Sequence, residues 1–155
     1  MTGLSSRLIA LLGYGGAIPF LGLGGLLLGG GQSAPVWPAG WADPSFMLLG
    51  YAAIILSFLG GLHWGRLAHA GHQVKAGDNL CLAFSVLPAL TGWLVLIWPL
   101  PVQTGGTLLL AGFGVCWWLD RQLVRAGAWA VFMARLRSHL TLSALFAMAC
   151  LVAAG

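Results

Sequence analysis

The sequence predicts an all-α integral membrane protein, a bundle of five transmembrane helices. Of its 155 residues, 59% are apolar and 6% are charged, whereas an ordinary soluble domain carries about 25% charged residues. The mean hydropathy is +0.93, and a soluble fold of this size could not hide so much apolar surface from water. Apolar stretches of about 20 residues recur along the chain, which is the length a helix needs to cross the bilayer core.

The apolar stretches divide the chain into five expected spans within one membrane domain, residues 1–155. The spans are residues 7–30, 45–67, 80–98, 104–123 and 137–154. Pro19 and Pro88 fall near the middle of the first and third spans, and each removes a backbone donor and disturbs the carbonyl four residues earlier. We therefore predict helix breaks at Pro19 and Pro88. The hydroxyl groups at positions 57, 85 and 91 could form hydrogen bonds with the backbone groups that these breaks leave without a partner. Paired broken helices favour a binding site at the midplane, although membrane helices also tolerate proline without one.

Residues 124–136 connect the fourth and fifth spans. Trp129, Phe132, Met133 and Leu136 can share one helical face, set against Arg125 and Arg135. This pattern predicts a short amphipathic helix that lies in the membrane interface before the fifth span.

The charges predict the orientation of the bundle. Lys and Arg residues occur at the start of the first span, around the second connection and around the fourth connection, and the first and third connections have none. By the positive-inside rule the N-terminus lies inside and the C-terminus outside. We expect the bacterial inner (cytoplasmic) membrane, with the protein crossing it several times.

Two glycine pairs at four-residue spacing predict close helix packing. Gly25 and Gly29 lie in the first span, and Gly61 and Gly65 lie in the second. Residues four apart share a helical face, and glycine lets another helix approach that face closely.

A polar cluster is expected at the inner ends of the spans. The second span ends with His63, Trp64 and Arg66, the fourth with Asp120, and the fifth begins near Arg135 and Arg137. A carboxylate among cations in a region of low dielectric should pair with one of them, because an unpaired buried charge is costly. We predict that Asp120 pairs with Arg137, Arg66 or Arg135, and that the pair and His63 form the floor of any pocket. The alternative is an interfacial cluster that binds anionic lipid.

Several motifs resemble one membrane protein family. They are Gly16-Ala17-Ile18-Pro19-Phe20, Tyr51, the block from Ile54 to Gly65, Ser85-Val86-Leu87-Pro88-Ala89-Leu90, Asp120, Leu136-Arg137 and Leu140-Thr141. In this order they resemble the bacterial and mitochondrial inner-membrane family DUF3429, which includes transmembrane-protein-69-like proteins. The resemblance implies a membrane location and a topology, and it implies no activity.

The chain contains no Glu and only three acidic residues. General acid–base catalysis by a pair of carboxylates is therefore not favoured. We expect a non-enzymatic protein, without cofactor or metal, that acts through a bound lipid or a membrane protein partner. The expected partners are membrane lipids, anionic ones included, and another membrane protein or a second copy of the chain. One alternative is a binder or carrier of an apolar molecule such as a quinone, lipid or porphyrin. A second is a b-type haem redox protein that uses His63 and His139 as axial ligands.

Overall fold

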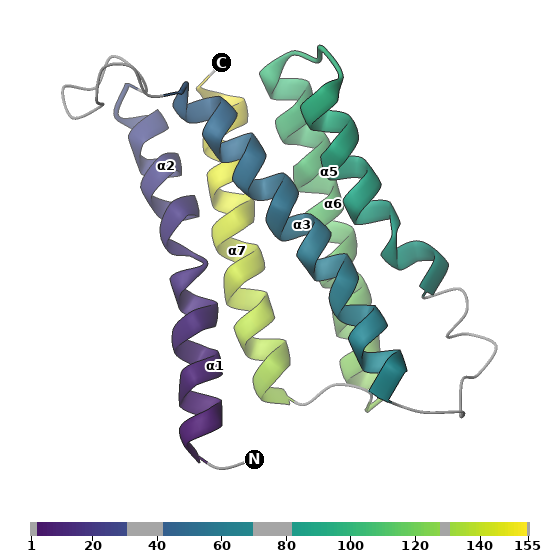
Figure 1. Cartoon of the computed structure of the whole chain (residues 1–155). Coiled ribbons are helices and arrows are strands. Elements are labelled where there is room, and N and C mark those ends of the chain that lie inside the picture. Colours follow the sequence, from purple (N-terminus) through teal and green to yellow (C-terminus); the bar gives the residue numbers. More distant parts are fainter. Residues whose placement is uncertain (1–2, 31–41, 70–81, 128–130, 155) are drawn as a thin grey trace.

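The computed structural model describes residues 3–30, 42–69, 82–127 and 131–154, which form helices and contain no strand (Figure 1). In chain order the helices are α1 (Gly3–Gly15), α2 (Ile18–Leu28), α3 (Pro44–His69), α5 (Leu87–Ile97), α6 (Val102–Arg125) and α7 (Val131–Ala153). The all-helical fold expected from the sequence is therefore confirmed.

Among the described residues, four helical segments are long and apolar enough to cross a membrane. They are Arg7–Leu28, Pro44–Gly65, Val102–Arg125 and Arg135–Ala153. A shorter apolar helix covers Leu82–Ile97. Lipid enforces helix in such segments, because no water is present to satisfy an open backbone group.

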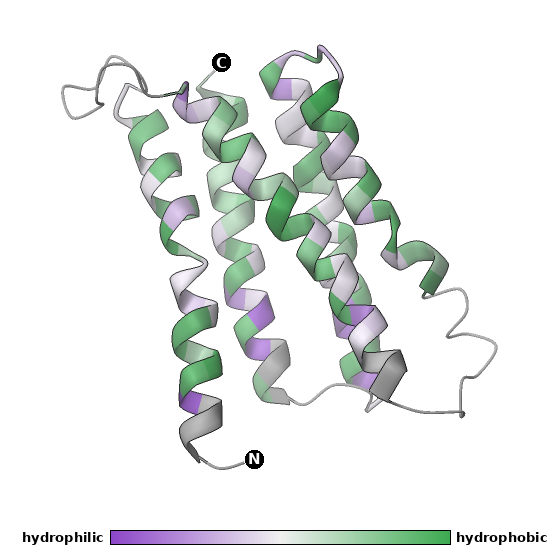
Figure 2. Ribbon diagram, viewed as in Figure 1, coloured by the Kyte–Doolittle hydropathy of each residue, from purple (hydrophilic) through white to green (hydrophobic). Residues whose placement is uncertain are grey.

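Helices α3 and α7 hold the bundle together. Helix α3 contacts α2, α5, α6 and α7, and α7 also contacts α1, α2 and α6. Their shared core contains Phe20, Leu56, Leu109, Phe113 and Met148, all fully buried. The two chain ends lie at opposite ends of the bundle (Figure 1). Hydrophilic residues of α1, α6 and α7 gather at the N-terminal end, as Figure 2 shows.

The two predicted helix breaks are present. Helix α1 ends at Gly15 and α2 begins at Ile18, with Pro19 in its first turn. The apolar helix of residues 82–97 is interrupted at Val86, and Pro88 lies in the first turn of α5. A proline in a first turn costs little, because the N–H groups there have no partner within the helix.

Within the described parts of residues 124–136, the expected interfacial helix is not found as a separate element. Residues 124–125 belong to α6, and residues 131–136 belong to α7, which is continuous to Ala153. Helix α6 ends at Arg125, and Gly127, two residues later, has a positive φ of 71°, a conformation that suits glycine and stops the helix. No glycine or proline follows until the end of α7, so residues 131–134 extend the last helix beyond the apolar segment Arg135–Ala153. Trp129 lies outside the described residues.

The glycines that allow close packing are not the predicted ones. A Cβ atom at Gly25, Gly61 or Gly65 would meet nothing within 4 Å, and one at Gly29 would meet only backbone of its own helix. The close approaches occur instead at the neighbouring Gly24, Gly60 and also at Gly92. A Cβ there would meet Cα of Ala147, the Ser85 carbonyl and the Ala53 carbonyl respectively. The four-residue spacing identifies residues on one face, but it does not say which way that face points.

Candidate functional site

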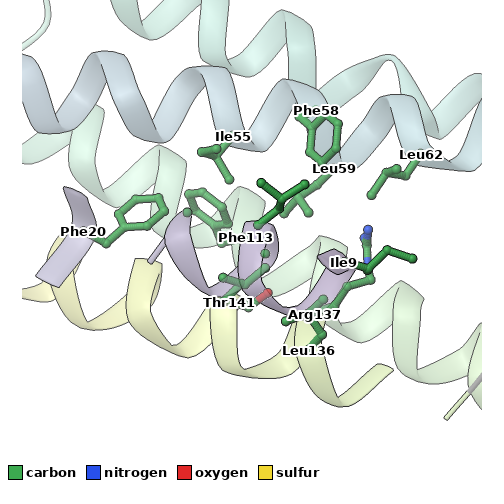
Figure 3. A pocket seen from close by; sticks show the side chains of 14 residues that line it. Ile9, Phe20, Ile55, Phe58, Leu59, Leu62, Phe113, Leu136, Arg137 and Thr141 are labelled. Atoms are coloured by element: carbon green, nitrogen blue, oxygen red, sulfur yellow. The ribbon is translucent and has the colours of Figure 1, made fainter. Parts of the chain in front are cut away.

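An apolar cavity of ≈ 350 Å³ lies between α1, α2, α3, α6 and α7. Ile55, Phe58 and Leu59 on α3 face Arg137 and Thr141 on α7 across it (Figure 3). Most of the remaining wall is leucine, phenylalanine and glycine. The volume lies at the lower end of the range typical of ligand pockets, about 300–1,000 Å³.

The break between α1 and α2 shapes one wall of this cavity. Gly13 and Gly16 line it from the end of α1 and from the break itself, and Phe20 lines it from α2. The Tyr51 hydroxyl donates a hydrogen bond to the Gly16 carbonyl at 2.9 Å. This bond joins α3 to the interrupted backbone, so the break is held in place by its neighbour.

A buried ion pair joins α6 to α7 at the floor of the cavity. Arg137 Nε donates to Asp120 Oδ2 at 2.7 Å, and Nη2 donates to Oδ1 at 2.8 Å. The two residues are 3% and 6% exposed. Two parallel charge-assisted bonds are the strongest geometry for such a pair. Arg137, one of the three predicted partners of Asp120, is thus confirmed.

His63 approaches the same carboxylate from α3. Its imidazole is 2% exposed, and Nε2 lies 3.9 Å from Asp120 Oδ1. Asp120 is therefore the point at which α3, α6 and α7 come together. The predicted grouping of His63 with the ion pair is present, and Arg137 is the member that lines the cavity.

The other residues expected in the cluster lie elsewhere. Trp64 is 55% exposed, and its Nε1 donates to Ser85 Oγ at 2.6 Å, beside the second helix break. Arg135 is exposed, because two residues along α7 turn it about 200° away from Arg137. The side chain of Arg66 lies outside the described part of the structure.

His139 does not join His63. Its Nδ1 lies 2.9 Å from the Tyr14 hydroxyl of α1, and the two rings stack with centroids 6.0 Å apart. His139 is exposed and, like Arg135, lies about 200° around α7 from Arg137. The two imidazoles thus have partners on different helices, and this arrangement does not favour axial ligation of one haem.

Charge and residue spacing in the sequence did not predict two residues of the site. Thr141 lines the cavity one turn after Arg137, and Tyr51 holds the helix break. Both belong to the motifs that carry the family resemblance, which was the available signal. Ser57, expected at a break, instead donates to the Ala53 carbonyl of its own helix at 2.8 Å.

A second hollow of ≈ 640 Å³ lies at the opposite end of the bundle, among the ends of α2 and α7 and the beginnings of α3 and α6. Its acidic residue, Asp43, is engaged in capping α3. Oδ1 accepts hydrogen bonds from the backbone N–H groups of Ser45 and Phe46 at 2.7 and 3.3 Å. This acid serves the start of a helix, so the apolar cavity is the stronger candidate site.

Comparison with known proteins gives a family and one named relative. The family model described as "Protein of unknown function (DUF3429)" matches residues 5–153. The chain is 31% identical over 141 residues to Transmembrane protein 69 of Xenopus tropicalis. The aligned region covers 88% of this chain and 50% of that protein. The chain thus spans about half the length of this relative. No solved structure matches the chain.

The family match runs from the first turns of α1 to the last residue of α7. It includes both helix breaks, the cavity wall and the Asp120–Arg137 pair. Together with the apolar helices, this match shows that the chain belongs to the DUF3429 family and is a helical membrane protein.

Proposed function

We propose that this chain is a non-enzymatic protein of the bacterial cytoplasmic membrane that binds an apolar small molecule of the bilayer. A lipid, a quinone or a porphyrin belongs to this class. The observation that carries the proposal is the cavity of ≈ 350 Å³ between α1, α3 and α7. It is more than twice the volume of about 150 Å³ that suffices for benzene in an engineered apolar cavity.

The chemistry of the wall supports binding rather than catalysis. The charged residue that lines the cavity, Arg137, is held by two hydrogen bonds to Asp120. The other lining residues are apolar except for the hydroxyl of Thr141. Such a wall provides a large apolar contact area and a few polar groups that orient a ligand.

The proposal includes five membrane crossings with the N-terminus inside. Four helices of spanning length, the shorter helix of residues 82–97 and chain ends at opposite ends of the bundle support it. Hydrophilic residues of α1, α6 and α7 gather at the end of the bundle that carries the N-terminus (Figure 2). Arg7 lies in the first half of α1, Arg121 and Arg125 at the end of α6, and Arg135 near the start of α7. The positive-inside rule places that end in the cytoplasm.

Mass spectrometry of the purified protein tests the binding function, with two adjacent isoleucines of α3 as a matched pair. Ile55 lines the cavity, whereas Ile54 is 65% exposed on the outside of the bundle. We expect one apolar molecule per chain to co-purify with the wild type and the Ile54→Trp variant. The Ile55→Trp variant should lose it, because the indole fills the cavity. Equal ligand content in the two variants, or no stoichiometric ligand in the wild type, would contradict the proposal.

A second candidate is an interaction with a membrane protein partner or with a second copy of the chain through α3. Gly61 and Gly65 are exposed on α3 and open to the surroundings of the bundle. Glycines four residues apart on a lipid-facing surface suit the close approach of another helix. Light scattering of the detergent-solubilised protein tests self-association. The particle mass should fall in Gly61→Leu if two copies meet there, and an unchanged mass would argue against this face.

A further inference from the structure

The cavity has one polar corner. Arg137 and Thr141 stand one turn apart on α7, so both side chains lie on the same face of the helix. Figure 3 shows both of them at the cavity wall, across from the apolar side chains of α3. A molecule that fills this space meets donors at the α7 side and hydrocarbon elsewhere. The wall therefore matches an amphiphile with a small polar end.

The polar corner carries a compensated charge. The Asp120 carboxylate receives two hydrogen bonds from the Arg137 guanidinium, and both groups are almost fully buried. His63 lies on the other side of the carboxylate, with Nε2 3.9 Å from Asp120 Oδ1. An anionic ligand at this corner would have to compete with Asp120 for Arg137 and would lose its own hydration. A neutral ligand does not compete for the charge of Arg137, and its carbonyl loses far less hydration free energy than an ionised group does.

Resting on the proposed binding function, we infer that the cavity selects a neutral amphiphile whose polar end is a carbonyl. The carbonyl oxygen accepts a hydrogen bond at the corner formed by Thr141 and Arg137, and the apolar part lies along Ile55, Phe58 and Leu59. Asp120 is the specificity residue, because it cancels the charge that would otherwise attract a carboxylate or a phosphate. A quinone and an uncharged ester lipid both offer this chemistry.

Photolabelling of the full chain in phosphatidylcholine nanodiscs tests the inference. One probe is a long-chain methyl ester with a diazirine in its chain, and the matched probe is the alkyl sulfonate of equal length, which stays ionised. We expect the ester to label cavity residues at least about tenfold more than the sulfonate. Binding of the sulfonate would bury an ionised group next to the Asp120–Arg137 pair, which has no net charge to compensate it. Peptide mapping should place the label on α1, α3 and α7.

Three variants give the matched controls. Thr141→Val should reduce labelling by the ester about 2- to 10-fold, the value of one hydrogen bond. Thr107→Val should not, because Thr107 is exposed and bonds within α6. Asp120→Asn should raise labelling by the sulfonate relative to the ester, because the Arg137 charge is then uncompensated. If Asp120→Asn does not fold, the ratio of ester labelling to sulfonate labelling in the wild type still tests the inference.

The outcomes separate the two proposals. Labelling of the cavity by the sulfonate as strongly as by the ester would overturn the inferred selectivity and leave the binding function standing. Absence of cavity labelling by both probes would overturn the binding function and the inference with it. Displacement of the ester by a short-tailed ubiquinone supports a quinone as the source of the carbonyl, and displacement by a diacylglycerol supports a neutral lipid.

Discussion

Asp120 is the acid at which three helices meet. It receives two hydrogen bonds from Arg137 of α7 and lies 3.9 Å from His63 of α3. The net stabilisation from such a pair is small when both partners are compared with well-packed apolar residues, yet removal of one partner leaves a buried charge without compensation. The single and double substitutions should therefore differ strongly.

We expect Asp120→Ala to lower the free energy of unfolding by about 3–5 kcal/mol. The double variant Asp120→Leu with Arg137→Met should recover most of this loss, because no charge is then left buried. Denaturant titration in detergent micelles measures both. Arg135→Met, which removes an exposed cation two residues from Arg137, is the control and should change little. Equal losses for Asp120→Ala and Arg135→Met would show that the pair does not stabilise the bundle.

At the scale of the helices, packing depends on the rotation of each helix about its axis. Gly60 faces the Ser85 carbonyl and the ring of Pro88, whereas a Cβ atom at the adjacent Gly61 would meet nothing within 4 Å. One residue turns the position by about 100°. Adjacent glycines of one helix therefore give a matched pair.

We expect Gly60→Leu to lower the free energy of unfolding by about 1–3 kcal/mol or more, because the side chain forces the backbone of α3 away from the segment before α5. Gly61→Leu should be tolerated within the bundle. Thermal unfolding in detergent gives the comparison, and a second pair, Gly24→Leu against Gly25→Leu, repeats it on α2. The packing register would be wrong if Gly61→Leu were the more destabilising of the first pair.

For the whole molecule, the distribution of charge sets the orientation in the membrane. The basic residues of α1, α6 and α7 belong to the N-terminal end of the bundle, and the C-terminus lies at the other end (Figures 1 and 2). Cytoplasmic connections retain Lys and Arg because these residues are translocated poorly.

A compartment reporter fused after Gly155 should be active outside the cytoplasm, and one inserted within residues 74–79 should be active inside. The insertion site lies outside the described residues, so this expectation rests on Lys75 and on the order of the spans. As a control, moving the reporter from the end of the chain to the N-terminus should reverse its side. Activity of both original fusions in one compartment would contradict five crossings.

The sequence alone determined the class of the protein and much of its layout. Composition and apolar length established a helical membrane protein, because hydrocarbon leaves the backbone no alternative to helix. Pro19 and Pro88 identified the two breaks, since the loss of an N–H group is a local property of the chain. Placing Asp120 near Arg137 also followed from sequence, because both stand at span ends that the alternation of spans brings to the same side.

Only the tertiary structure decided which faces meet. It chose Arg137 over Arg135, Gly60 over Gly61 and Tyr51 rather than Ser57 as the partner of a broken helix. Spacing determines the angle between two residues of one helix, but the rotation of the helix against its neighbours depends on contacts far apart in the chain. The cavity depends on these contacts as well, because its wall comes from five helices, and no single segment contains the information that they leave a space between them.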